Sequence, residues 1–124
     1  MKLDKELVRD ILLKLEADDS DPRLPKEISV PGWTRSQISY HIEQLSEGNL
    51  VAAVNFSSGD GHDWQAKRLT YSGHEFLDTV RDGEVWRKTK EVANKTGVYS
   101  LQVLMEAGKM VVKQKLMEHG LHLL

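Results

Sequence analysis

Six polar side chains in two short segments have the types and spacing needed to contact a nucleic acid. Residues 34–47 read as an amphipathic helix, because Ile38, Ile42 and Leu45 recur at positions i, i+4 and i+7 and predict one buried face. Polar residues of the same segment then point outward. Arginine can donate two hydrogen bonds to guanine, and hydroxyl groups can bind phosphates or base edges. The candidate DNA-contacting residues are Arg35, Ser36, Ser39 and Tyr40 on this helix, with Lys67 and Arg68 on a later strand.

The charge of this region argues against tight binding to DNA. Residues 34–70 carry three basic and four acidic side chains, a net charge of −1. About three phosphate contacts per protomer would give a slope near −3 when log affinity is plotted against log salt concentration, which is shallow for a DNA-binding protein. The acidic residues that phosphates would repel are Glu43, Glu47, Asp60 and Asp63. Two functions therefore stay open: a DNA-binding transcriptional regulator, and a protein–protein interaction module that does not bind DNA.

Catalytic and metal-binding patterns are weak in this chain. The sequence contains no glycine-rich phosphate loop, no Gly-x-Ser-x-Gly and no His-Glu-x-x-His. His62 lies near Asp60 and Asp63 in a predicted loop, where a metal would be held only weakly, and cysteine is absent. His41, next to Ile42, is better explained as a partly buried, hydrogen-bonded ring than as a ligand or a pH switch. We therefore expect no enzyme activity, no metal site and no cofactor.

Composition places the chain among ordinary globular proteins. Its 124 residues are 29% charged and 40% hydrophobic, which fits one domain with a core of its own. No apolar run approaches the roughly 20 residues of a membrane span, and the first residues alternate charged with apolar side chains, unlike a signal peptide. We therefore expect a cytoplasmic protein with no membrane partner. Net charge varies along the chain: −2 for residues 1–33, −3 for 34–82 and +3 for 83–124.

Hydrophobic periodicity predicts a mainly α protein with a small β-sheet, an α+β fold. Thr34 is the expected N-cap of the helix at 34–47, and Gly48-Asn49 supplies a left-handed residue that ends it. The loop 57–63 between two strands is rich in turn-forming residues. The predicted helices span about 3–17, 34–47, 71–82, 84–95 and 99–119, and the predicted strands about 26–30, 50–56 and 64–70.

Two of these segments resemble parts of bacterial winged-helix regulators. Ile38-Ser-Tyr-His-Ile-Glu-Gln-Leu-Ser-Glu-Gly-Asn-Leu-Val looks like the recognition helix and following strand of ArsR- and MarR-type proteins. Lys67-Arg-Leu-Thr-Tyr-Ser-Gly-His-Glu-Phe-Leu looks like the step from their wing into the next helix. Nearly the whole chain also resembles a bacterial and prophage family of small proteins known only as a domain of unknown function.

The resemblance implies a winged-helix domain over residues 1–82, with a wing sheet of two or three strands, and a C-terminal helical extension over 83–124. It also implies DNA binding by a transcriptional regulator. One element departs from the winged-helix pattern: the helix that ordinarily precedes the recognition helix is missing or is replaced by the predicted strand at 26–30. Because that helix braces the recognition helix across the DNA backbone, its replacement bears directly on DNA docking.

The last predicted helix is apolar around more than half of its circumference, so more than one surface must cover it. One explanation is that the helices at 71–82 and 84–95 wrap it completely. The other is a homodimer, in which a second copy covers the remaining face. For that homodimer the expected interface residues are Leu101, Leu104, Met105, Met110, Val111, Val112 and Leu116.

Overall fold

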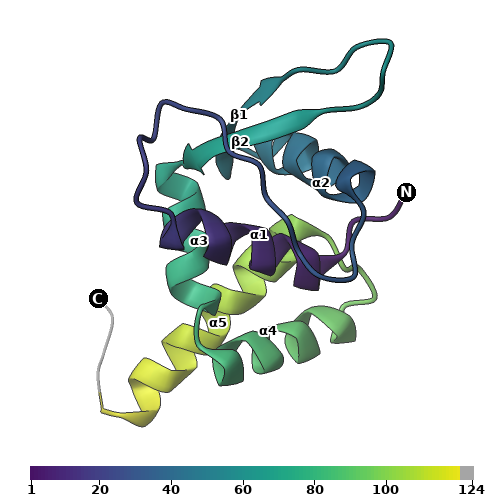
Figure 1. The fold of residues 1–124 in the computed structure, drawn as a ribbon. Coiled ribbons are helices and arrows are strands. Elements are labelled where there is room, and N and C mark those ends of the chain that lie inside the picture. Colours follow the sequence, from purple (N-terminus) through teal and green to yellow (C-terminus); the bar gives the residue numbers. More distant parts are fainter. Residues whose placement is uncertain (121–124) are drawn as a thin grey trace. The chain divides into compact units, whose positions relative to one another are not determined.

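The computed structural model describes residues 1–120, which form five helices and one two-stranded antiparallel sheet (Figure 1). The predicted α+β class is confirmed. The elements are α1 (Lys5–Ala17), α2 (Arg35–Glu47), β1 (Val51–Asn55), β2 (Trp64–Leu69), α3 (Tyr71–Val80), α4 (Gly83–Lys95) and α5 (Leu101–Glu118). Among the described residues, no helix combines the length and the hydrophobicity that crossing a membrane requires.

The chain divides into two compact units, Met1–Leu77 and Asp78–Leu124. The division falls inside α3, whereas the sequence placed a boundary after residue 82, at the start of α4. The first unit therefore contains α1, α2 and the hairpin, and the second contains α4 and α5.

Local hydrogen bonds fix where α1 and α2 begin and end. The Asp4 side chain accepts the amide of Leu7 at 2.9 Å and caps α1. Thr34 and Gln37 form a reciprocal capping box at the start of α2, so the predicted Thr34 cap is confirmed. Asn49 has a φ of 62°, which confirms the prediction that Gly48-Asn49 supplies the left-handed residue that ends α2.

The acidic stretch after α1 is an exposed loop ordered by its own side chains. Asp18 accepts both the hydroxyl and the amide of Ser20, and these hydrogen bonds lower the pKa of the Asp18 carboxyl. Asp21 binds the guanidinium of Arg23 and accepts its amide, which lowers the pKa of Asp21 in the same way. These contacts stabilise carboxylates that face water, so the stretch acts as a connection between elements.

The first unit is built around the buried face of α2. Helix α1 packs against α2 and β2, and α2 packs against both strands. Ile38, Ile42 and Leu45 are at most 5% exposed, as their spacing predicted. Burial of each such side chain stabilises the fold by about 1.5–3 kcal/mol. The hairpin pairs Val51 with Leu69 and Asn55 with Trp64, with an irregularity between Ala52 and Ala53.

The strand predicted at 26–30 is wrong beyond its first residue. Only Lys26 bridges to β2, where its amide donates to the carbonyl of Ala66 at 2.9 Å. The Lys26 ammonium donates to the backbone carbonyls of Asp21, Leu24 and Lys67 at 3.0, 3.0 and 2.6 Å, and it ties the segment to β2 at this one point. The chain then leaves the sheet edge, buries Val30 and turns at Gly32, whose φ is 86°. The sheet therefore has two strands.

The start of α3 is fastened directly to the turn between α2 and β1. The amide of Thr70 donates to the carbonyl of Leu50 at 3.1 Å, and the Thr70 hydroxyl donates to the carbonyl of Asn49. The same hydroxyl oxygen accepts the amide of Gly73 at 3.0 Å and caps the helix. A Cβ on Gly73 would overlap the carbonyl oxygen of Leu50, so only glycine fits at this position.

In the second unit, α4 packs against α5. Gly108 of α5 lies so close to the end of α3 that a Cβ there would sit 2.8 Å from Cγ2 of Thr79. Trp86, Thr89 and Ala93 form the buried stripe of α4. Within residues 1–120, the Thr89 hydroxyl is a buried polar group without a hydrogen-bond partner.

Replacing Thr89 by valine is expected to stabilise the protein by about 1 kcal/mol. Valine has nearly the same shape, and it removes the desolvation cost of the unpaired hydroxyl. Thr96 is the matched control, because its hydroxyl donates to the carbonyl of Ala93 at 2.7 Å and accepts the amide of Val98 at 3.1 Å. Urea denaturation should show a higher midpoint for Thr89→Val and a lower one for Thr96→Val. A lower midpoint for Thr89→Val would show that its hydroxyl is satisfied in solution.

Candidate functional site

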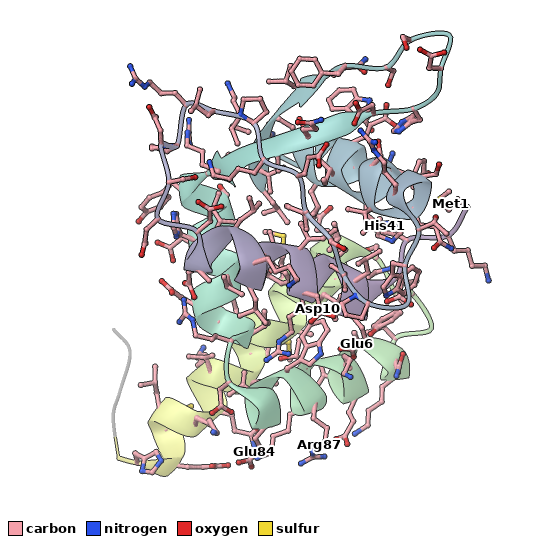
Figure 2. All side chains as sticks on the ribbon, viewed as in Figure 1. Met1, Glu6, Asp10, His41, Glu84 and Arg87 are labelled. Carbon is pink, nitrogen blue, oxygen red and sulfur yellow. The ribbon has the colours of Figure 1, made fainter. Side chains whose placement is uncertain are left out.

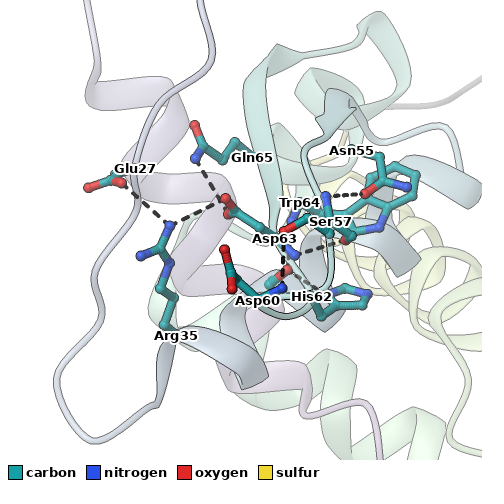
Figure 3. Close-up of polar contacts among 11 residues, drawn as sticks. Glu27, Arg35, Asn55, Ser57, Asp60, His62, Asp63, Trp64 and Gln65 are labelled. Carbon is teal, nitrogen blue, oxygen red and sulfur yellow. Dashed lines mark hydrogen bonds and ion pairs between the residues drawn. The ribbon is translucent and has the colours of Figure 1, made fainter.

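The loop that joins β1 to β2, residues 56–63, is folded by its own polar groups. Ser58 and Gly61 exchange two backbone hydrogen bonds of 3.0 Å and form the tip. Below the tip, the Ser57 hydroxyl accepts the amide of Asp63 at 2.9 Å, and the Asn55 side chain accepts the amide of Ser57 at 2.8 Å (Figure 3). This internal order gives the hairpin loop (residues 56–63) a defined position from which His62 and Asp63 reach α2.

Ser39 and His62 join α2 to the hairpin loop. The amide of Trp64 donates to Oγ of Ser39 at 2.6 Å, and Oγ lies 2.6 Å from Nδ1 of His62. Nε2 of His62 is 3.4 Å from a carboxylate oxygen of Glu43, one turn further along α2. With the Trp64 amide as donor, the Ser39 proton can be donated to Nδ1, and the Nε2 proton then faces Glu43.

The order serine, histidine, carboxylate is also the order of a nucleophilic triad, so access to Ser39 decides what the cluster can do. Ser39 is only 3% exposed, and its oxygen already accepts the Trp64 amide. A nucleophile needs an open approach to its oxygen, and the burial of Ser39 closes that approach. The arrangement therefore positions the hairpin loop on α2 and presents no accessible nucleophile.

Arg35 stands at the start of α2 and is bound from two sides (Figure 3). One Nη lies 3.3 Å from Oδ2 of Asp63 in the hairpin loop and 3.7 Å from an oxygen of Glu27. The Arg35 side chain is 71% exposed and that of Glu27 is 79% exposed, so both ion pairs are open to water. Arg35 therefore bridges two segments that are far apart in the sequence, and two carboxylates surround its charge.

A cavity of about 360 Å³ lies beneath this bridge. This volume is at the lower end of the range of roughly 300–1,000 Å³ for ligand pockets. Its rim carries Glu27, Arg35, Asp63 and Gln65, and its other lining residues are Lys26, Ile28, Ser29, Trp33, Ile38, Ser39, Ile42 and Trp64. The lining thus combines aromatic and aliphatic side chains with carboxylates, cations and hydroxyl groups.

The six predicted DNA-contacting residues do not all face solvent. Ser39 is buried, so the prediction that its side chain points outward is wrong: the returning strand β2 covers this turn of α2. Arg35 and Ser36 are exposed, and Tyr40 is half-buried. On β2, Lys67 is half-buried, and Arg68 is exposed and donates from Nη1 to the carbonyl of Leu69 at 3.1 Å.

Sequence reasoning missed the part played by Glu27 and by the indole rings of Trp33 and Trp64. Glu27 is separated from Asp63 by 36 positions, and no local pattern indicates that both carboxylates meet one guanidinium. The available signal was composition: a tryptophan on each side of α2 and acidic residues in both flanking segments.

His41 connects α2 to the start of α1 through hydrogen bonds of its ring. It is fully buried, and its ring lies between α2 and the start of α1 (Figure 2). Nε2 accepts the amide of Asp4 at 2.8 Å, and Nδ1 lies 2.7 Å from the carbonyl oxygen of Gln37. Nδ1 must therefore be the protonated nitrogen of a neutral ring. The interpretation of His41 as a hydrogen-bonded histidine is confirmed, but the ring is fully buried, whereas the sequence predicted partial burial.

The seven residues predicted for a dimer interface separate into three groups by exposure. Leu104 is fully buried and Val111 is 7% exposed within a single chain, so neither side chain is available to a partner. Met110 is 62% exposed. The remaining four, Leu101, Met105, Val112 and Leu116, are half-buried.

Comparison with known proteins gives the chain a family. The sequence pattern of the DUF2513 family, described as a hypothetical protein, matches residues 2–99. A Haemophilus influenzae protein named "Uncharacterized protein" is 31% identical over 117 residues, which is 94% of this chain and 99% of that protein. No solved structure matches the chain. The predicted membership of a family of unknown function is confirmed: the chain belongs to the DUF2513 family.

Proposed function

We propose that this chain is a winged-helix protein-interaction module in which α2 and the hairpin loop bind a basic segment of a partner protein. The observation that carries the proposal is the position of Arg35. The most exposed cation at the start of α2 is already held by Glu27 and Asp63, so the surface around it is acidic.

The order of elements supports the winged-helix part of the proposal. Helix α2 runs through the Asn49 turn into the β1–β2 hairpin, and β2 runs directly into α3. Thr70 fastens the start of α3 to the α2–β1 turn by donating to the carbonyls of Asn49 and Leu50. The hairpin loop corresponds to the wing, and its contacts through Ser39 and Asp63 hold it against α2.

Charge supports a basic partner over duplex DNA. The unit Met1–Leu77 contains nine Lys and Arg residues and thirteen Asp and Glu residues, a net charge of −4. Duplex DNA carries one negative charge per roughly 1.7 Å of its axis, so this unit meets long-range repulsion. A basic protein segment meets attraction, which raises the rate of association and disfavours anionic competitors.

Duplex DNA is the second candidate, because one observation favours it. Arg35 and Ser36 are exposed on the first turn of α2, and Tyr40 is half-buried further along the helix. A recognition helix contacts base edges from its N-terminal residues. For DNA binding, however, Arg35 would have to leave both carboxylates, and about three cations per chain would supply the phosphate contacts.

The binding surface can be mapped by following backbone amide signals in two-dimensional NMR. The probe is a peptide of eight residues alternating arginine and glycine, and its matched control alternates glutamate and glycine. We expect the basic peptide to shift the amides of Glu27, Arg35, Glu43 and Asp63, and the acidic peptide to shift none. Shifts confined to α4 and α5, or equal shifts with both peptides, would contradict the proposal.

We also propose that the chain forms a homodimer through the exposed face of α5. Met110 and Met117 are 62% and 56% exposed and lie seven residues apart, on one face of the helix. If two α5 helices pair antiparallel about an axis between residues 113 and 114, Met110 of one copy meets Met117 of the other. Lys109 then meets Glu118, so the surface is self-complementary, as a two-fold interface requires.

Met110→Asp is expected to split the dimer, because an unpaired charge in an interface costs several kcal/mol. Light scattering at about 50 μM should give twice the chain mass of 14.1 kDa for the parent protein and a single chain mass for the variant. Val98→Asp is the matched control, because Val98 is 56% exposed and lies outside α5. A single chain mass for the parent protein would refute the dimer.

A further inference from the structure

The cavity beneath Arg35 has the chemistry to hold a specific side chain. Ile38 and Ile42 form part of its floor, and Trp33 and Trp64 line it. Glu27 and Asp63 supply carboxylates at the mouth. We propose that this cavity receives an arginine side chain of the partner protein, an inference that rests on the proposed function and specifies its ligand.

The chain itself shows that the mouth binds a guanidinium. Both carboxylates hold the guanidinium of Arg35, at 3.3 Å from Asp63 and 3.7 Å from Glu27. Both distances exceed the roughly 2.7–2.9 Å of a strong charge-assisted hydrogen bond, and the Arg35 side chain is 71% exposed. Arg35 is therefore a weakly held occupant, and a better-placed guanidinium can displace it.

The interior explains why arginine suits the cavity better than lysine. A guanidinium is planar, is weakly hydrated and stacks on aromatic faces, whereas an ammonium is a strongly hydrated point charge. Tryptophan is the best aromatic partner for a cation. Oδ1 of Asp63 already accepts the Gln65 amide at 3.4 Å. Once Arg35 is displaced, Oδ2 of Asp63 and the Glu27 carboxylate are the oxygens left to bind the incoming guanidinium.

The cations near the cavity do not fill it themselves. The Lys26 ammonium donates to three backbone carbonyls and is fixed at the base of the hairpin. Arg35 is the lining cation that competes with a ligand for the two carboxylates. Removing the Arg35 side chain should therefore strengthen ligand binding, the opposite of what its loss would do to a DNA-binding surface.

The test uses the full chain and two short probes, Gly-Gly-Arg-Gly-Gly and Gly-Gly-Lys-Gly-Gly, each blocked at both ends. We expect Arg35→Ala to bind the arginine probe about tenfold more tightly than the parent protein, because the competing guanidinium is gone. The lysine probe should bind more weakly to both proteins. Asp63→Asn should weaken binding of the arginine probe, while Ser36→Ala, at an exposed neighbouring position, should leave it unchanged.

Indole N–H signals show directly where the probe binds. Trp33 and Trp64 line the cavity, whereas Trp86 lies buried in α4, so a probe in the cavity should shift two of the three indole signals. Equal binding of both probes, or weaker binding to Arg35→Ala, would overturn the arginine site and leave the acidic surface intact. If neither these probes nor the basic peptide binds, the proposed function fails as well.

Discussion

Replacing Gly73 by alanine is expected to destabilise the protein by more than about 3 kcal/mol, near the upper end of single-residue effects. An alanine Cβ would overlap the backbone carbonyl oxygen of Leu50 and lie 3.0 Å from its carbonyl carbon. Backbone atoms cannot rotate away as a side chain can, so α3 must move off the α2–β1 turn. That movement breaks the bonds from Thr70 to Asn49 and Leu50.

Gly83→Ala is the matched control, because Gly83 begins α4 and nothing lies within 4 Å of the position its Cβ would take. Alanine there should be neutral or stabilising by up to about 1 kcal/mol, since it favours the helix. Urea denaturation monitored by circular dichroism measures both variants. A Gly73→Ala protein as stable as the parent would show that α3 is not packed tightly against the carbonyl of Leu50.

The second large effect is expected at His41. His41→Ala should destabilise the fold by about 3 kcal/mol, because it leaves a cavity in the core and an unpaired amide at Asp4. His41→Phe fills the volume but cannot accept that amide, so it should cost about 1–2 kcal/mol. The order of stability is then parent, His41→Phe, His41→Ala.

Hydrogen exchange at Asp4 separates the two contributions of His41. The amide of Asp4 precedes α1 and donates to Nε2 of His41, so the parent protein should protect it. Both variants should lose this protection, although they differ in stability. Protection that survives in His41→Phe would show that the hydrogen bond to the ring contributes little.

Local signals in the sequence predicted the elements correctly wherever short-range chemistry decides them. Thr34 caps α2 because its hydroxyl can reach the Gln37 amide three residues later. Asn49 ends the same helix because asparagine tolerates a positive φ. The start of α3 was indicated by the resemblance of the segment that begins at Lys67 to a wing-to-helix step, and in the structure Thr70 caps this helix by accepting the amide of Gly73.

Contacts between distant segments could not be read from the same signals. Helical spacing placed Ser39 on the polar side of α2, yet β2 covers that side and the Trp64 amide takes up its hydroxyl. The meeting of Glu27 and Asp63 at Arg35 depends on where the hairpin loop folds back. The position of a residue along a helix predicts the direction of its side chain. Whether that side chain reaches solvent depends on which other elements pack there.

Two further errors have the same origin. The run at 26–30 has the composition of a strand, but the Lys26 ammonium binds three carbonyls and the chain leaves β2 after one bridge. Leu104 and Val111 were predicted for an interface because α5 is broadly apolar, and both are buried within the chain. Periodicity counts apolar residues without showing which neighbour covers them.

Whether α2 and the hairpin loop bind a basic segment or DNA can be tested by comparing duplex DNA with a basic peptide on the same protein. Fluorescence anisotropy would measure binding of a random-sequence duplex and of the alternating arginine–glycine peptide, each at about 50 and 200 mM salt. We expect the peptide to bind, more weakly at the higher salt concentration, and the duplex not to bind at either concentration. Micromolar or tighter duplex binding with a steep salt dependence would contradict the interaction module and establish α2 and the hairpin loop as a DNA-binding surface.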